Sequence, residues 1–267
     1  MEQVWAKLRY EISRNGLRHT TIGVLEKGLV LVLSRSAYTY RSIAPRYFQS
    51  RASSNLCEYV NPPDVFKIEM ADPEDINFIT GRQNPHVNRR LNFGRVLEGD
   101  WDRSCEPFDE QPFYTSASAH FQEGVPWEET KVFEEYRQNL REGTNDPTLY
   151  HDEESLLSYL RSFDDLYERI LNEGYATNSQ IDQFDGKPEP TPYLCTLDEV
   201  TVDVGRDGEL LFCDGKHRLT IAKLLEVEQI PITFLVRHRQ WMEYRDRISR
   251  TNDVPDHPDL RDLRSEN

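Results

Sequence analysis

Residues 212–220, with the sequence FCDGKHRLT, combine a carboxylate, a glycine and three basic side chains within one short turn. Apolar residues precede this turn, and apolar residues at helical spacing follow it between positions 219 and 225. The pattern therefore predicts that the turn opens a helix. First-turn N–H groups lack intrahelical acceptors and the helix dipole is positive there, so this position favours a phosphate group.

Gly215, Lys216, His217 and Arg218 are the candidate phosphate ligands of this turn, because basic side chains add donors to those of the helix terminus. A carboxylate beside a phosphate is repulsive unless a metal ion bridges the two, so we expect Asp214 to hold Mg²⁺. The alternative is structural, since Asp is a common N-cap, Gly a common turn residue and Arg a common ion-pair partner. The spacing alone leaves both interpretations open.

The elements that would position this turn are predicted on both sides of it. Alternating apolar residues in 199–204 and an apolar run in 210–213, separated by the sequence GRDG, predict a β-hairpin. The helix that follows Gly215 is expected to end near 228–229. Residues 230–236, IPITFLV, then predict a further strand.

The order of these features resembles the ParB/sulfiredoxin superfamily. The resemblance rests on DG-x-HRL, on the following IAK-LL and on the next strand, and it covers about residues 155–245. Upstream, NEGY at 172–175 and Ser179-Gln180 resemble the first box of the superfamily, where a helix ends and a strand begins. The resemblance implies an α/β fold with a mixed sheet that binds nucleotide phosphates at the turn, with Gln180 as a further ligand.

Members of this superfamily include partition proteins that bind CTP, sulfiredoxins that use ATP and kinases that phosphorylate free serine. Lys216 stands where sulfiredoxins have their catalytic cysteine, and the Lys-His-Arg sequence differs from the Glu and two arginines usual in partition proteins. The Asp-Gly-x-His-Arg form is most similar to the kinase-like branch. The resemblance thus implies ATP or ADP as cofactor, with CTP as a further candidate, together with Mg²⁺.

Acidic and aromatic residues elsewhere are candidates for the acceptor side of a site. Trp101 lies between Asp100 and Asp102, so the indole is a candidate to stack on a base or sugar and either carboxylate a candidate general base. Glu173 is a third candidate base. Arg237 and His238 follow the strand 230–236, and strand ends border ligand crevices in α/β sheets, which makes both candidate ligands of an anionic substrate. The alternatives are core aromatics, capping acids and a helix start with solvated charges.

The charge of the 267-residue chain is −15, from 47 acidic and 32 Lys or Arg side chains, and such a field makes nucleic acid an unfavourable partner. Only seven of these cations are lysine, a composition also typical of halophilic proteins, for which net charge says little about partners. Cys57, Cys105, Cys195 and Cys213 are widely spaced, which predicts reduced thiols rather than a zinc ribbon or a disulfide framework. A cytoplasmic location is therefore expected.

The first 51 residues form a basic segment of net charge +6, with apolar stripes at helical spacing before position 34. The favoured interpretation is a helical arm that packs on the acidic body. The alternative is peripheral contact of residues 1–34 with anionic lipid at the inner face of the membrane.

Composition divides the rest of the chain into three parts. Residues 52–150 form a loop-rich, aromatic region with one predicted strand at 65–68 and a helix at 128–142, and residues 151–250 form the nucleotide-binding domain, led by a helix at 153–172. Residues 251–267 are expected to be a loosely ordered tail.

The function that these features predict is nucleotide-dependent phosphoryl transfer to a hydroxyl-bearing small molecule or a lipid-linked saccharide. Two alternatives stay open. One is a ParB-like DNA-associated protein or nuclease, and the other is a non-catalytic sensor of a nucleotide or sugar phosphate.

Overall fold

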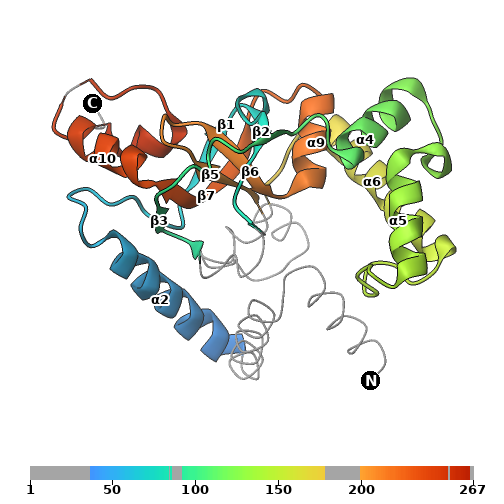
Figure 1. Ribbon diagram of the computed structural model, residues 1–267, viewed down its shortest axis with the longest axis horizontal. Helices are drawn as coiled ribbons and strands as arrows, with labels where there is room; N and C mark the ends of the chain where they lie inside the picture. Colours follow the sequence, from blue (N-terminus) through green and yellow to red (C-terminus); the bar gives the residue numbers. More distant parts are fainter. Residues whose placement is uncertain (1–36, 84, 86–91, 178–198, 252, 265–267) are drawn as a thin grey trace.

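The computed structural model describes residues 37–83, 85, 92–177, 199–251 and 253–264 (Figure 1). Residues 1–36 of the predicted helical arm, which was expected to cover residues 1–51, lie outside the described residues, as do Gln180 and Cys195. In the part of the chain that is described, no helix is long and apolar enough to cross a membrane.

A mixed sheet of seven strands forms the centre of the fold, in the order β1-β7-β5-β6-β2-β4, with β3 also paired to β7. The strands are β1 (Ile68–Ala71), β2 (Phe78–Ile79), β3 (Arg95–Leu97), β4 (Glu106–Pro107), β5 (Val200–Val204), β6 (Leu210–Asp214) and β7 (Ile230–His238). Together with the helices, this sheet confirms the mixed α/β class predicted from the sequence.

Strand directions give the sheet two distinct ends. β3, β5 and β7 are parallel, so their last residues, Leu97, Val204 and His238, lie at one end, which we call the carboxyl edge. β6 runs antiparallel to β5, and Thr201 pairs with Asp214. The end at which β5 begins and β6 finishes is the amino edge.

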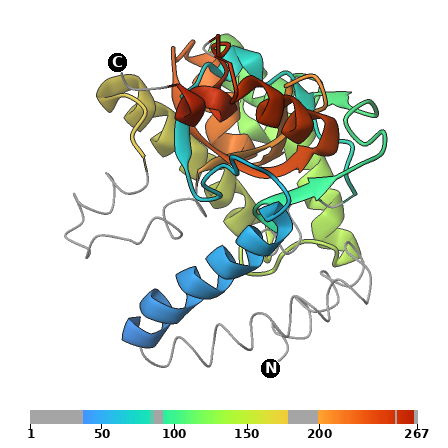
Figure 2. The ribbon, with the colours of Figure 1, turned by 90° about the vertical axis from the view of Figure 1, so that its left-hand side faces the viewer.

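Helices flank the sheet on two sides. A group of three helices lies next to α9, whereas α10 lies on the opposite side of the sheet (Figure 1). A further helix, α2, projects from the sheet (Figure 2). The helices are α2 (Ala37–Leu56), α4 (Pro112–Glu123), α5 (Lys131–Glu142), α6 (Glu153–Glu173), α9 (Lys216–Leu224) and α10 (Arg239–Ile248), with short 3₁₀ turns η1 (Pro73–Asp75), η2 (Trp127–Glu129) and η3 (Pro258–Leu263).

Local signals in the sequence explain several helix ends. Asp152 and Ser155 form a capping box at the start of α6, and the Thr130 side chain accepts a hydrogen bond from the third residue of α5. Gly124 and Gly143 end α4 and α5 in the left-handed conformation that glycine favours.

The buried apolar residues form three clusters. The largest joins the sheet to α9 and α10 through residues such as Val202, Phe234 and Leu219. A second packs α2 against β7, and a third lies within the group α4, α5 and α6, around Trp127. The third cluster also contacts α9 through Leu224, so the helical group supports the helix that begins with the predicted phosphate turn.

The structure confirms the predicted hairpin and the predicted helix at 153–172, which it extends to Glu173. Three details differ. The strand predicted at 65–68 begins only at Ile68, and α9 ends at Leu224 rather than near 228–229, because the chain adopts a positive φ at Glu226. No helix was predicted at α4, whereas α2 begins within the predicted helical arm of residues 1–51 and continues beyond it to Leu56.

Strands from 52–150 and from 151–250 share one sheet, so these two ranges do not form separate sheets. β2 pairs with β6, and β1 and β3 pair with β7. Four short strands from the earlier range thus complete a sheet whose long strands come from the later one.

The segment 253–264 differs from the loosely ordered tail that was expected. Asp259 and Leu260 are fully buried within it, and the Asp259 carboxylate accepts hydrogen bonds from Arg237 and Trp241. Charge pairing and a few irregularly spaced apolar residues, Val254, Leu260 and Leu263, hold this segment, and they do not produce the apolar periodicity on which the prediction relied.

Candidate functional site

The predicted phosphate turn lies at the amino edge of the sheet, where β6 ends and α9 begins. Gly215 is the N-cap of α9 and has a φ of 91°, in the left-handed region. A Cβ atom added there would lie 3.1 Å from the Cα of Val200, so both conformation and space favour glycine. No N-cap side chain caps α9, and the Oδ1 of Asp214 accepts the N–H of Gly215 at 2.8 Å. The turn thus places a carboxylate and an uncapped helix terminus side by side.

Lys216 is held by the helical group. Its Nζ donates a hydrogen bond to the Oη of Tyr136 at 2.8 Å and lies 5.6 Å from the ring centre of Phe113 and 5.5 Å from that of Tyr136. Aromatic faces attract an ammonium ion without neutralising it. These contacts position the Lys216 side chain at the turn.

Arg218 is held by a charged partner, the carboxylate of Glu199, and by a main-chain carbonyl. Its Nη1 donates to the Oε2 of Glu199 at 2.9 Å, and its Nη2 donates to the carbonyl of Ala176 at 2.7 Å. The guanidinium also lies 4.5 Å from the ring centre of Tyr175. The Glu199 side chain is fully buried, so the Arg218 charge compensates a carboxylate that water does not reach.

His217 faces the aromatic cluster of the helical group. Its ring stacks on Phe163 at 4.1 Å between centroids and meets the edge of Phe113 at 4.5 Å. Burial, and to a lesser degree the neighbouring Lys216, lowers the pKa of His217 to about 3. Its Nε2 is buried and forms no hydrogen bond with the described residues. At neutral pH this histidine carries no charge that would attract a phosphate.

Asp100 and Asp102 lie at the carboxyl edge and bind Arg206. Asp102 accepts the Arg206 main-chain N–H and its Nε–H, both at 2.8 Å, whereas Asp100 is 81% exposed and accepts from Nη2 at 2.7 Å. Burial opposes ionisation of Asp102, but the hydrogen bonds from Arg206 outweigh it and lower its pKa to about 2. A carboxylate with so low a pKa is a weak general base.

The other predicted substrate ligands are also at the carboxyl edge. His238 caps α10, since its Nδ1 accepts the N–H of Gln240 at 3.1 Å, and the Trp101 ring lies 5.8 Å from its imidazole. Arg237 is 1% exposed and forms two hydrogen bonds with Asp259, at 2.6 and 2.9 Å. These side chains take part in internal packing and pairing.

The structure therefore separates the predicted residues into two groups. The five-residue strand β5 runs between the edges, a distance of roughly 13 Å at about 3.3 Å per residue. The phosphate turn lies at the amino edge, and Asp100, Trp101, Asp102, Arg237 and His238 lie at the carboxyl edge. Glu173, the last residue of α6, has an exposed side chain and lies three residues before Ala176, whose carbonyl accepts a hydrogen bond from Arg218.

Magnesium binding at Asp214 would depend on ligands from a nucleotide. Among the described residues, no group of three or more His, Cys, Asp or Glu side chains is arranged to hold a metal ion. A Mg²⁺ ion bound by one or two carboxylates, phosphate oxygens and waters is the usual arrangement in nucleotide sites, and one protein ligand is compatible with it.

Two residues that contact the turn, Tyr136 and Glu199, were not predicted from the sequence. Tyr136 comes from α5, 80 residues before Lys216, and nothing in the sequence connects them. Glu199 begins the predicted hairpin strand, and a carboxylate beside the alternating valines of that strand is a signal that could have predicted a buried ion pair.

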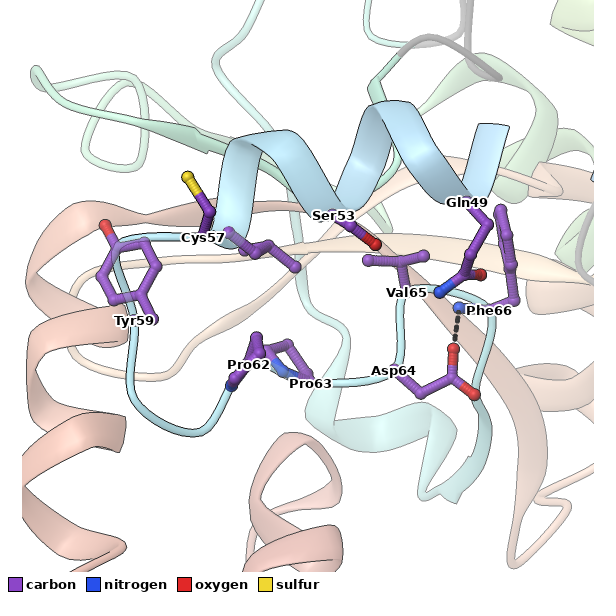
Figure 3. A pocket seen from close by; sticks show the side chains of 10 residues that line it. Gln49, Ser53, Cys57, Tyr59, Pro62, Pro63, Asp64, Val65 and Phe66 are labelled. Carbon is purple, nitrogen blue, oxygen red and sulfur yellow. Dashed lines mark hydrogen bonds between the residues drawn. The ribbon is translucent and has the colours of Figure 1, made fainter. Parts of the chain in front are cut away.

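A pocket of about 660 Å³ lies between α2 and residues 59–66 (Figure 3). Gln49 and Ser53 of α2 form one wall, and Pro62 and Pro63 lie opposite. The Asp64 carboxylate in the lining accepts the N–H of Phe66 at 3.0 Å. None of the predicted site residues lines this pocket, and it has no basic side chain in its lining.

Comparisons of the chain with protein-family models, with curated proteins and with solved structures gave no match.

Proposed function

We propose that this protein binds nucleotide phosphates at residues 214–218 and transfers a phosphoryl group to a hydroxyl-bearing small molecule or a lipid-linked saccharide. The observation that carries the proposal is the left-handed Gly215 that opens α9 without an N-cap side chain, directly followed by a lysine held over aromatic rings. The sequence resemblance to the kinase-like branch of the ParB/sulfiredoxin superfamily supports the same reaction class.

The two cations of the turn would have different roles. Lys216 donates to the phenol of Tyr136, and we assign its ammonium group to the phosphate oxygens of the nucleotide. Arg218 is already balanced by Glu199, so we assign it mainly to orientation of the turn, through its bonds to the buried carboxylate and to Ala176. Removal of Arg218 would take an ion-pair partner from the buried Glu199, a change that costs stability as well as binding.

The nucleotide would be ATP or ADP, with CTP as a further candidate, and Asp214 would contact its Mg²⁺. When bound, the ion would neutralise charge on the phosphates. Of the three carboxylates predicted as general bases, Glu173 remains the candidate for orienting the acceptor hydroxyl, because it lies three residues before Ala176, whose carbonyl accepts a hydrogen bond from Arg218 of the turn. Asp102 has a depressed pKa and, like Asp100, belongs to the carboxyl edge.

A non-catalytic sensor of a nucleotide or sugar phosphate is the second candidate. It is favoured by one observation, the separation of Asp100 and Asp102 from the turn. The sensor would use the same phosphate turn but would consume no nucleotide.

Calorimetric titration of ATP, ADP and CTP with Mg²⁺ in molar KCl tests the phosphate turn. Lys216→Gln should weaken nucleotide binding by roughly 10-fold to 100-fold, because one charge-assisted hydrogen bond to the phosphates would be lost. Lys131→Gln, an equal charge change at an exposed lysine of α5, is the matched control and should bind as the wild type does. Equal affinity of the Lys216 variant and wild type, or no binding to wild type, would reject the site.

Nucleotide consumption then separates the enzyme from the sensor. Wild-type protein is incubated with the bound nucleotide and a panel of hydroxyl-bearing acceptors, and phosphorylated products are measured. Acceptor-dependent turnover that Glu173→Gln reduces supports the kinase. Tight binding without product across the panel supports the sensor.

A further inference from the structure

A second pocket, of about 640 Å³, lies at the carboxyl edge of the sheet, and we call it the carboxyl-edge pocket. The β5–β6 turn, α10 and residues 255–260 enclose it. Its volume is within the range of small-molecule sites, roughly 300–1,000 Å³. Crevices outside the carboxyl ends of parallel strands are where open α/β sheets bind ligands, and β3, β5 and β7 all end here. The lining includes Arg206, Gln240, Trp241, Glu243, Tyr244 and Arg247.

Aromatic side chains make one wall of the pocket, and the surrounding structure holds them in place. The Trp241 ring lies 5.3 Å from Tyr244 and 4.6 Å from His257. The Trp241 Nε1 donates to Asp259 at 2.9 Å, and a Cβ atom added to Gly208 would lie 2.7 Å from the indole. His257 is fixed by its contacts with the Gly208 carbonyl and the Asp259 N–H. The wall therefore has little freedom to reorganise.

Several polar groups of the lining have no internal partner. Among the described residues, the side chains of Gln240, Glu243 and Arg247 form no hydrogen bond or ion pair, and Arg247 contacts only the Tyr244 ring, at 5.8 Å. Arg206 is different, since Asp100, Asp102 and the Gly99 carbonyl hold its Nε and Nη2. The pocket thus offers donors and acceptors that folding does not use.

The charges of these groups decide the class of ligand. Arg206 is balanced by Asp102, and the carboxylates of Asp207 and Asp256 pair with Arg103 and Arg264. The charge of Arg247 is equal and opposite to that of Glu243. The lining therefore has no excess of positive charge for a phosphate and, among the described residues, no group of three or more carboxylates for a metal ion. An aromatic wall beside mixed donors and acceptors suits a ring with apolar C–H groups on its face and hydroxyl groups at its rim, because each hydroxyl both donates and accepts.

We propose that the carboxyl-edge pocket binds a neutral saccharide, with one sugar face against Tyr244 and its hydroxyl groups bound by Gln240, Glu243 and Arg247. This site is separate from the phosphate turn, which lies at the opposite edge of the sheet. The inference does not depend on the proposed phosphoryl transfer.

Saturation-transfer NMR of the full chain with neutral monosaccharides and disaccharides tests the proposal, with the corresponding sugar phosphates as a comparison. We expect at least one neutral sugar to bind with a Kd below about 10 mM. Tyr244→Ala should weaken this binding by roughly 10-fold, because one aromatic contact surface would be lost. Arg247→Gln and Gln240→Ala, both at exposed positions, should also weaken binding if the fold is unchanged.

Arg250→Gln removes a similar exposed charge just beyond α10, outside the pocket lining, and should leave sugar binding unchanged. Lys216→Gln should also leave it unchanged, so that failure of the phosphate turn and failure of this pocket remain distinguishable. Absence of any neutral sugar bound below about 10 mM would overturn the proposal. So would binding of phosphorylated sugars alone, or binding that all three pocket substitutions leave unaltered.

Discussion

Asp259→Asn is the substitution whose effect the structure defines most sharply. The carboxylate is fully buried and accepts hydrogen bonds from Arg237 at 2.6 and 2.9 Å and from Trp241 at 2.9 Å, with the Nζ of Lys67 3.3 Å away. Although burial disfavours its charge, attraction by Arg237 and Lys67 keeps the pKa of Asp259 far below its usual range. Asn keeps the shape and removes the charge, so the buried guanidinium of Arg237 loses its counter-ion.

Removing the charge of one partner of a buried ion pair costs roughly 3–5 kcal/mol, which is a large fraction of the roughly 5–15 kcal/mol that stabilises a typical domain. We therefore expect Asp259→Asn to lower the free energy of unfolding by about that amount. In a chain of this size the unfolding midpoint would fall by roughly 6–20 °C. Asp253→Asn, an exposed position in the same segment, is the matched control and should change stability by less than about 0.5 kcal/mol.

Urea unfolding followed by tryptophan fluorescence measures both variants, since Trp241 is a direct partner of Asp259. The folded pKa lies below the unfolded value of about 3.9, so the carboxylate contributes its full stability above that pH and loses it as the pH falls further. The difference between wild type and Asp259→Asn should accordingly persist from pH 7 to about pH 5. A loss below about 1 kcal/mol at pH 7 would refute the assignment of this segment to the core.

Two further predictions concern other parts of the structure. Asp102→Asn should lower the free energy of unfolding at pH 7 by roughly 1–2 kcal/mol, because the folded pKa of Asp102, about 2, lies below its unfolded value. Urea unfolding should show the difference between the variant and wild type shrinking as the pH falls from about 4 to about 2. A constant difference over that range would contradict the pairing with Arg206. In thiol labelling, exposed Cys57 should react rapidly and buried Cys213 only on unfolding, since burial raises the Cys213 pKa well above its usual value. Rapid labelling of a Cys57→Ser variant at Cys213 would contradict its burial.

Much of the local architecture around the phosphate turn could be predicted from the sequence. The period-2 alternation before Gly205 gave the β5–β6 hairpin, and the apolar spacing after Asp152 gave α6. Both signals are local, because side-chain direction repeats along a strand or helix regardless of what packs on it. The 3₁₀ turn η3 had no such signal, since burial of Asp259 depends on cations from distant parts of the chain.

The mixed α/β class, the hairpin and the glycine turn that opens α9 follow from local sequence patterns. The pairing of charged side chains depends on how the chain folds. The tertiary structure brought Asp102 to Arg206 across 104 residues and Lys216 to Tyr136 across 80, and it placed the predicted acids at the edge opposite the turn. The physical reason is that backbone geometry follows from neighbouring residues, whereas the pairing of a side chain follows from the segments that the folded sheet brings to the same edge.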